Sequence, residues 1–434
     1  MSAGTATADL DTGLALHSAT REPAGADRDH SLALLIGVCS VAFLLRLALA
    51  FYIVSHYGLV SVYGGFESCR IAASIVSGHG FSSPYGIPTG PTAWLPPVYP
   101  YLVAAVFKLL GVYSLASLWC LILVNIACET LTVVVLFRIG WRCFGPMTAF
   151  AGSFLWAVEL GAVAYGVRLW ESSLSALLVT LSVLLYLHLL ESPSKVRDWI
   201  LYGLLWAFAA LTNTALLTLM PLPVGVLLIR KWRQVRWHAL VALAVFLCAL
   251  APWTIRNYAV FHKVIPVRGN FGPNLWYGNH PGVQGPADQT LNPMKNRDEF
   301  LVYQRMGEAS YAASRQQMAL GFIRQHRAEF LRLTWTRIIY FWTASETFAP
   351  IWRACVSLLA FVGLLLMRRN SIAGIAPFAS ALLLFPLPYY VTHSESFYRH
   401  PVEPLVGLLV AYACVALVGL GRVVGKAKST ARQP

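Results

Sequence analysis

Long apolar stretches separated by short polar connections make up most of this chain. Each stretch approaches the roughly 20 residues that a helix needs to cross a hydrocarbon core of about 30 Å. We count about ten, of which the pair over 199–229 is the least clearly delimited; they lie at about 32–54, 115–137, 146–166, 171–190, 199–217, 219–229, 238–255, 350–367, 372–391 and 402–421. The pattern predicts an all-α polytopic membrane protein.

Composition supports this class and removes another. The 434 residues are 57% hydrophobic and 12% charged, which is too little charge to cover a water-facing surface around so much apolar content. The net charge of +14 is spread over helix ends and connections, so it indicates membrane topology and no nucleic-acid partner. The eight cysteines show neither a disulfide framework nor zinc-ligand spacing.

The basic residues also predict the topology. We expect a disordered cytoplasmic tail over 1–30, a membrane domain over 31–422 and a basic cytoplasmic tail over 423–434. With the amino terminus in the cytoplasm, the basic clusters of the connections all fall inside; they are Arg138 and Arg142, Lys195 and Arg197, the run 230–236, Arg368 and Arg369, and the tail. This count requires 95–111 to lie along the interface as a short helix.

Four pieces of chain then reach the outer face: 55–114, 166–173, 256–349 and 392–400. The first has the composition of a loop that builds a site, because Glu67 on a short helical run is followed by a Gly/Pro-rich bend and a Pro-Pro-Val-Tyr-Pro corner. The long piece 256–349 contains apolar residues at helical spacing over 313–342, which predicts an amphipathic helix at the membrane surface.

Two outer acids are candidates for chemistry. Glu67 begins a short helix and Glu171 begins a predicted span. Each either serves a reaction or is an ordinary first-turn acid stabilised by the helix dipole. A third acid, Glu129, lies within the second long apolar stretch, where a charge is costly, and Arg46 of the first stretch is its expected structural partner.

Three arginines lie at the same outer boundary: Arg256, Arg268 and Arg399. Guanidinium suits phosphate because its planar fork offers paired donors and keeps its charge. These groups either gather around one lipid-borne anion, bind anionic headgroups or snorkel to the interface. Snorkelling is the expectation for the arginines of the amphipathic helix, namely Arg324, Arg327, Arg332 and Arg337.

The order of these features resembles a known superfamily. It comprises an acid in the first outer loop, a helix ending in Gly-x-Gly-Phe, the segment GPTAWLPPVYPYLVAAVFKLLG, PWTIRN at an outer helix end and YRHPVEPLVGLLVAY at the last span. From about residue 31 to 422 the chain is similar to the GT-C superfamily, and more closely to glycosyltransferase family 39, relatives of protein O-mannosyltransferases and of the lipid A aminoarabinose transferase. The resemblance implies a GT-C-type helix bundle with juxtamembrane helices in the first outer loop and a long outer segment.

The resemblance also implies roles for single residues. Glu67 aligns with the acid that activates an acceptor hydroxyl; many relatives have paired acids where this chain has Phe66-Glu67, so either Glu67 acts alone or Glu171 shares the work. Arg256 and Arg399 fall where groups around the donor phosphate are expected, and Arg268 joins them by position. The expected substrate-binding residues are Asn257, Tyr99, Trp276, Tyr277 and His400, with Tyr303 a further candidate for stacking on the sugar.

The implied reaction moves a sugar, with inversion, from a polyprenyl-phosphate donor to a hydroxyl of a lipid, glycan or protein acceptor. The implied place is the outer face of a bacterial cytoplasmic (inner) membrane, with membrane lipids as partners. We expect no obligatory cofactor and no metal site, because the histidines lack ligand spacing, but leave open a divalent cation beside Glu67. The alternatives are a transporter or flippase of lipid-linked sugars, for which we find no clear internal repeat, and a non-catalytic assembly partner.

Overall fold

The computed structural model describes residues 25–63, 66–345 and 349–430. This part of the chain is helical, with one isolated bridge between Ser82 and Pro91. The helices are α1 Gly25–Tyr63, α2 Glu67–Val76, α3 Val98–Leu110, α4 Leu115–Phe144, α5 Pro146–Val158, α6 Leu160–Tyr165, α7 Ser172–Glu191, α8 Val196–Thr212, η1 Thr214–Leu219, α9 Pro221–Phe261, α10 Phe271–Gly278, η2 Gln289–Leu291, α11 Arg297–Met306, α12 Glu308–Gln325, α13 Arg327–Thr343, α14 Pro350–Arg369, α15 Ile375–Ala379, η3 Ser380–Leu384, α16 Leu387–Val391, η4 Ser396–Val402 and α17 Glu403–Thr430. The predicted tail over 1–30 lies mostly outside the described residues.

The prediction of a multi-pass membrane protein is confirmed. Within the described residues, six helical stretches are long and apolar enough to cross a bilayer: Ser31–Leu59, Leu115–Phe144, Ser172–Glu191, Thr214–Phe261, Pro350–Arg369 and Ser396–Gly419. Other expected spans correspond to shorter apolar helices, such as Pro146–Val158 and Ile375–Val391. The expected spans 219–229 and 238–255 both fall in α9, which has non-helical backbone angles at Lys231. The segment 95–111 forms the short helix α3, as predicted.

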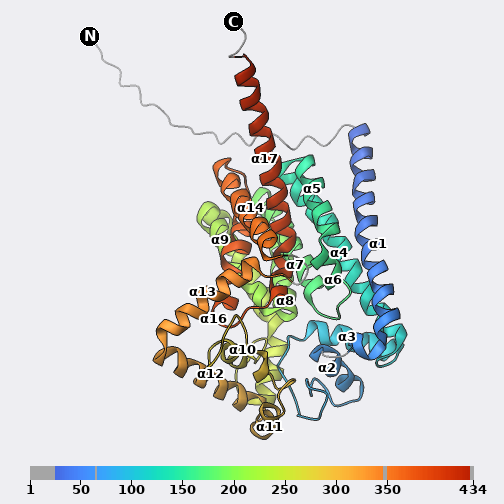
Figure 1. Ribbon diagram of the computed structural model, residues 1–434, viewed down its shortest axis with the longest axis vertical. Coiled ribbons are helices and arrows are strands. Elements are labelled where there is room, and N and C mark those ends of the chain that lie inside the picture. The colour runs from blue at the N-terminus through green and yellow to red at the C-terminus, as the bar shows by residue number, and fades with distance from the viewer. Residues whose placement is uncertain (1–24, 64–65, 346–348, 431–434) are drawn as a thin grey trace, which may run out of the picture.

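Figure 1 shows a bundle with a cap at one end. Helices α4, α5, α7, α8, α9, α14 and α17 pack together, and α1 runs along the side of α4 and α5. The helices of the connections that are predicted to be outer, α2, α3, α10, α11 and α12, lie at the end away from the carboxyl terminus. The fold therefore gathers segments far apart in sequence at one end of the bundle.

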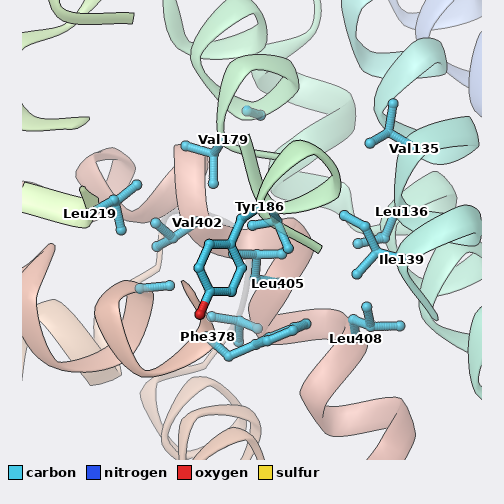
Figure 2. Packing of buried hydrophobic residues seen from close by; sticks show 14 of the residues in the cluster. Val135, Leu136, Ile139, Val179, Tyr186, Leu219, Phe378, Val402, Leu405 and Leu408 are labelled. Carbon is cyan, nitrogen blue, oxygen red and sulfur yellow. The ribbon is translucent and has the colours of Figure 1, made fainter. Parts of the chain in front are cut away.

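The core of the bundle is apolar and closely packed. Tyr186 of α7 lies among side chains of α4, η1, α15, η4 and α17 (Figure 2). Small residues allow helices to approach within backbone contact. A Cβ added to Gly203 of α8 would lie 2.4 Å from the carbonyl oxygen of Ala242 in α9, and one added to Gly363 of α14 would lie 2.3 Å from that of Leu409 in α17.

The bundle also buries ion pairs. Arg46 and Glu129 have fully buried side chains and are 3.4 Å apart, which confirms the predicted pair. His400 Nε2 lies 3.0 Å from the other carboxylate oxygen of Glu129. Because a buried charge is costly unless it is paired, these contacts fix how α1, α4 and η4 meet.

The segment predicted to be outer, over 256–349, forms helices that are bonded to the rest of the protein. The helix predicted over 313–342 is present as two helices, α12 and α13, with a break at His326. The prediction that Arg337 snorkels to the interface is wrong, since its side chain is fully buried and donates to the carbonyl oxygens of Gly278, Tyr390 and Val391. The reason is that α13 packs against α16, whose last carbonyl groups need donors, as does that of Gly278 at the end of α10.

Candidate functional site

A cavity of about 650 Å³ lies where the bundle meets its cap. Five connections contribute to its lining: 66–68 with 94–95, 170–172, 213–218, 268–295 and 392–398. Four of them belong to the pieces that the charge pattern assigns to the outer face. The fifth, 213–218, is the connection between α8 and α9, which sequence reasoning did not single out. The fold thus brings the four predicted outer pieces and the connection between α8 and α9 to one cavity.

Two of the predicted acids line this cavity. Glu67 is the first residue of α2, and Glu171 precedes α7; neither side chain caps its helix. Both are half-buried, with their remaining exposure on the cavity. Burial raises the pKa of Glu67. Burial raises the pKa of Glu171 to about 7, and the negative charge of Glu67 adds to this rise.

The charge of Arg268 acts on the pKa of both acids. Its charge opposes the rise in pKa of Glu67 and of Glu171, so its guanidinium group faces the same space as the two carboxyl groups. Its Nε donates to the carbonyl oxygen of Trp94 at 3.3 Å. Among the described residues, its two terminal nitrogens have no hydrogen-bond or ion-pair partner, so two adjacent donors are available to an anion.

The rest of the lining is rich in amides and aromatic rings. Asn270 Oδ1 and the Tyr277 hydroxyl are buried without a hydrogen-bond partner among the described residues. His393 is buried between the carbonyl oxygen of Asn274 and the hydroxyl of Tyr398, at 3.1 and 2.6 Å, and burial lowers its pKa to about 4, so the ring is neutral. Buried polar atoms without partners are uncommon in folded proteins, so these walls suit a polar ligand.

Several predicted site residues lie away from the cavity lining. Asn257 is buried and donates to the carbonyl oxygen of Ile265, and Tyr99 lies against Asn125. Trp276 and His400 are also buried outside it; His400 contacts Glu129. Their expected substrate-binding role stays a prediction.

Two predicted phosphate-binding arginines also have other partners. Arg256 donates to the carbonyl oxygens of Phe81 and Thr92, and Arg399 is buried beside Glu403. Of the ten residues predicted for the site, the structure brings four together in the lining: Glu67, Glu171, Arg268 and Tyr277.

Sequence reasoning missed the contribution of η1. Asn213, Thr214 and Thr218 line the cavity from a short 3-10 helix. The signal was present, because three hydrogen-bonding side chains interrupt an otherwise apolar run just before Pro221. Lys295 and Glu395 also line the cavity, and Glu395 accepts a hydrogen bond from Gln289 at 2.9 Å.

The described residues contain no group of three or more histidine, cysteine, aspartate or glutamate side chains placed to hold a metal ion. Glu67 and Glu171 therefore lack a third protein ligand of these types, and Arg268 supplies positive charge beside them.

Comparison with known proteins identifies the sequence signature of one segment. Residues 95–255 match the model of the family described as dolichyl-phosphate-mannose-protein mannosyltransferase. No curated protein matches the chain.

Two of the solved structures that are similar to this chain, with TM-scores above 0.5, share its fold. The archaeal oligosaccharyltransferase AglB from Archaeoglobus fulgidus, in complex with an inhibitory peptide and a dolichol-phosphate, is similar at 13% identity with a TM-score of 0.53, covering 93% of this chain and 52% of AglB. An Archaeoglobus fulgidus oligosaccharyltransferase in the apo form is similar at 12% identity with a TM-score of 0.54, and the match covers 92% of this chain and 52% of that protein. For ArnT from Cupriavidus metallidurans bound to undecaprenyl phosphate, the identity is 13% and the TM-score 0.35, and the match covers 83% of this chain and 77% of ArnT. This chain spans about half the length of AglB. The predicted resemblance to the GT-C superfamily and its helical membrane fold is confirmed.

Proposed function

We propose that this protein is a membrane glycosyltransferase that moves a sugar from a polyprenyl-phosphate donor to an acceptor hydroxyl. The observation that carries the proposal is the juxtaposition of Glu67, Glu171 and Arg268 in one cavity of a GT-C-like fold. Acids with raised pKa beside an arginine whose terminal nitrogens have no protein partner supply a base and an anion site for one reaction.

The donor phosphate binds Arg268 in this proposal. Two adjacent N–H donors suit a phosphate, and the cavity is partly dry, which strengthens the attraction. AglB, which shares the fold, was solved with a dolichol-phosphate, and this supports a lipid phosphate as the ligand. Arg256 and Arg399 support the walls instead, because their guanidinium groups are held by Phe81, Thr92 and Glu403.

The chemistry is a single displacement. Glu67 accepts the proton of the acceptor hydroxyl as that oxygen bonds to the anomeric carbon. The bond between the anomeric carbon and the phosphate oxygen breaks, and the bonding electrons leave with the polyprenyl phosphate, whose growing charge Arg268 stabilises. Attack opposite the leaving group inverts the anomeric carbon. Glu171 shares the base role, and the charge of Glu67 helps to keep the pKa of Glu171 high.

The cavity wall supplies contacts for the sugar. The unpartnered Tyr277 hydroxyl and Asn270 carbonyl oxygen are placed for sugar hydroxyl groups, and Trp170 and Phe397 offer aromatic faces. Four of the five connections that form the cavity are ones that the positive-inside rule assigns to the outer face, so we place the reaction on the outer face of a bacterial cytoplasmic membrane.

The test is to offer the purified protein in lipid a panel of polyprenyl-phosphate sugars with crude envelope as acceptor. The proposal predicts that one donor is consumed, with free polyprenyl phosphate released in equal amount. Arg332→Ala is a matched control for arginine loss, because Arg332 pairs with Glu329 on the exposed face of α13; it keeps the rate. If instead a donor crosses the bilayer intact and none is consumed, the protein is a transporter of lipid-linked sugars and the proposal fails.

A further inference from the structure

Residues 92–94, called the wall below, lie beside Arg268. Glu308 of α12 and Arg256 of α9 form hydrogen bonds with this stretch, and these bonds are called the clamp. The chain over 92–94 runs beside residues 268–269, with Gly269 N–H donating to the carbonyl oxygen of Ala93 at 2.8 Å and Arg268 Nε donating to that of Trp94. We infer that Glu308, Thr92 and Arg256 are positioning residues that aim Arg268 into the cavity. This inference rests on the proposed function, because it takes Arg268 as the group that binds the lipid phosphate.

Glu308, the first residue of α12, forms hydrogen bonds with the wall. Its carboxyl group is 5% exposed and accepts hydrogen bonds from the Thr92 hydroxyl, from Ala93 N–H at 2.6 Å and from the Tyr303 hydroxyl at 2.8 Å. The Thr92 oxygen in turn accepts from Trp94 N–H at 2.9 Å. Glu308 therefore fixes the three residues of the wall, and it connects α12 to a loop more than 200 positions earlier in the chain.

Arg256 of α9 forms hydrogen bonds with the backbone of Thr92. Its guanidinium group donates to the carbonyl oxygen of Thr92 at 2.7 Å and to that of Phe81 at 2.8 Å, and Asn257 Oδ1 accepts a further bond at 3.0 Å. Thr92 is thus held by its hydroxyl and by its carbonyl group, and its side chain is fully buried. This explains an arginine at the outer boundary without a phosphate.

The clamp has a consequence for the cavity. Within the described residues, the Arg268 side chain makes one hydrogen bond, to Trp94, so the position of residues 92–94 decides where its terminal nitrogens point. Misplacing a binding group by about 1 Å can cost on the order of a hundredfold in rate. Loss of the clamp should therefore weaken phosphate binding through Arg268, while Arg268 itself is unchanged.

A double-mutant cycle tests the coupling. We would measure binding of radiolabelled dolichyl phosphate to the protein in lipid nanodiscs, for wild type, Thr92→Val, Arg268→Ala and the double variant. Thr92→Val keeps the shape but removes the hydroxyl. We expect about tenfold weaker binding for each single variant and less than about twofold further loss when Thr92→Val is added to Arg268→Ala.

Two controls separate positioning from damage to the fold. Thr92→Ser keeps the hydroxyl and should bind as wild type does, whereas Thr336→Val removes a hydroxyl that bonds only its own helix and should change nothing. Independent losses that multiply in the double variant would overturn the clamp while leaving lipid-phosphate binding intact. No binding by wild type, with Arg268→Ala indistinguishable from it, would overturn the proposed phosphate site and the clamp with it.

Discussion

The two acids of the cavity predict an unusual pH dependence. The pKa of Glu171 is raised to about 7 from an ordinary value of 4.5, and that of Glu67 is raised as well. A general base works only when it is deprotonated, so the rate should fall as the pH drops through the raised pKa of the pair. At pH 6, about one tenth of Glu171 carboxyl groups with a pKa of about 7 are ionised, so the share of kcat/KM that needs ionised Glu171 should be about tenfold below its plateau.

Replacing Glu171 by glutamine makes the prediction sharper. It removes the carboxyl group whose pKa is raised to about 7, so the acid limb that remains belongs to Glu67 and lies at lower pH. The assay is kcat/KM for the donor between about pH 5 and 9, at constant ionic strength, a range that brackets the raised pKa. Glu329→Gln is the matched control, because Glu329 pairs with Arg332 outside the cavity, and it should reproduce the wild-type profile.

Either of two results would refute this reasoning. The first is a wild-type acid limb near the ordinary pKa of 4.5, which would mean that burial does not act on the essential acid. The second is a limb that does not move in Glu171→Gln, which would mean that Glu171 takes no part in the essential base.

Three further predictions concern stability, packing and metal dependence. Glu129→Leu leaves the guanidinium group of its buried partner unpaired and should lower the free energy of unfolding by about 3–5 kcal/mol, whereas Glu191→Gln, in a more exposed pair, should cost about 0–1 kcal/mol; chemical unfolding in detergent measures both. Gly278→Ala should lower the yield of folded protein, seen by size-exclusion chromatography, because its Cβ would lie 1.8 Å from the Thr392 carbonyl oxygen; Gly285→Ala, with open space around it, should not. Treatment with EDTA should leave the rate of donor consumption unchanged, and a loss restored by one divalent ion would contradict the metal-free account.

The sequence predicted much of the fold because its signals are local. Apolar length identifies the main spans, and the positions of Lys and Arg identify the connections that meet at the cavity. The short helix carrying Glu67 followed from the same kind of local pattern.

The residues whose roles the sequence could not predict make contacts with residues far away along the chain. Arg256, Arg268 and Arg399 look alike in sequence, each at an outer helix end. Only the fold shows that Arg256 bonds carbonyl groups 164 and 175 positions away, while the terminal nitrogens of Arg268 face the cavity. The prediction for Arg337 was wrong for the same reason, because an amphipathic pattern does not reveal that α13 packs against the ends of α16 and α10. The site in η1 was hidden because an apolar run concealed the short turn between two helices.

The account as a whole depends on Glu67. The most direct test is a single-turnover measurement with the donor that wild type consumes, comparing wild type with Glu67→Gln at saturating acceptor. A group that acts only in the transition state contributes about a hundredfold or more, so the account predicts a loss of that size with donor binding retained. A Glu67→Gln rate within about twofold of wild type, below any effect expected of a general base, would contradict it.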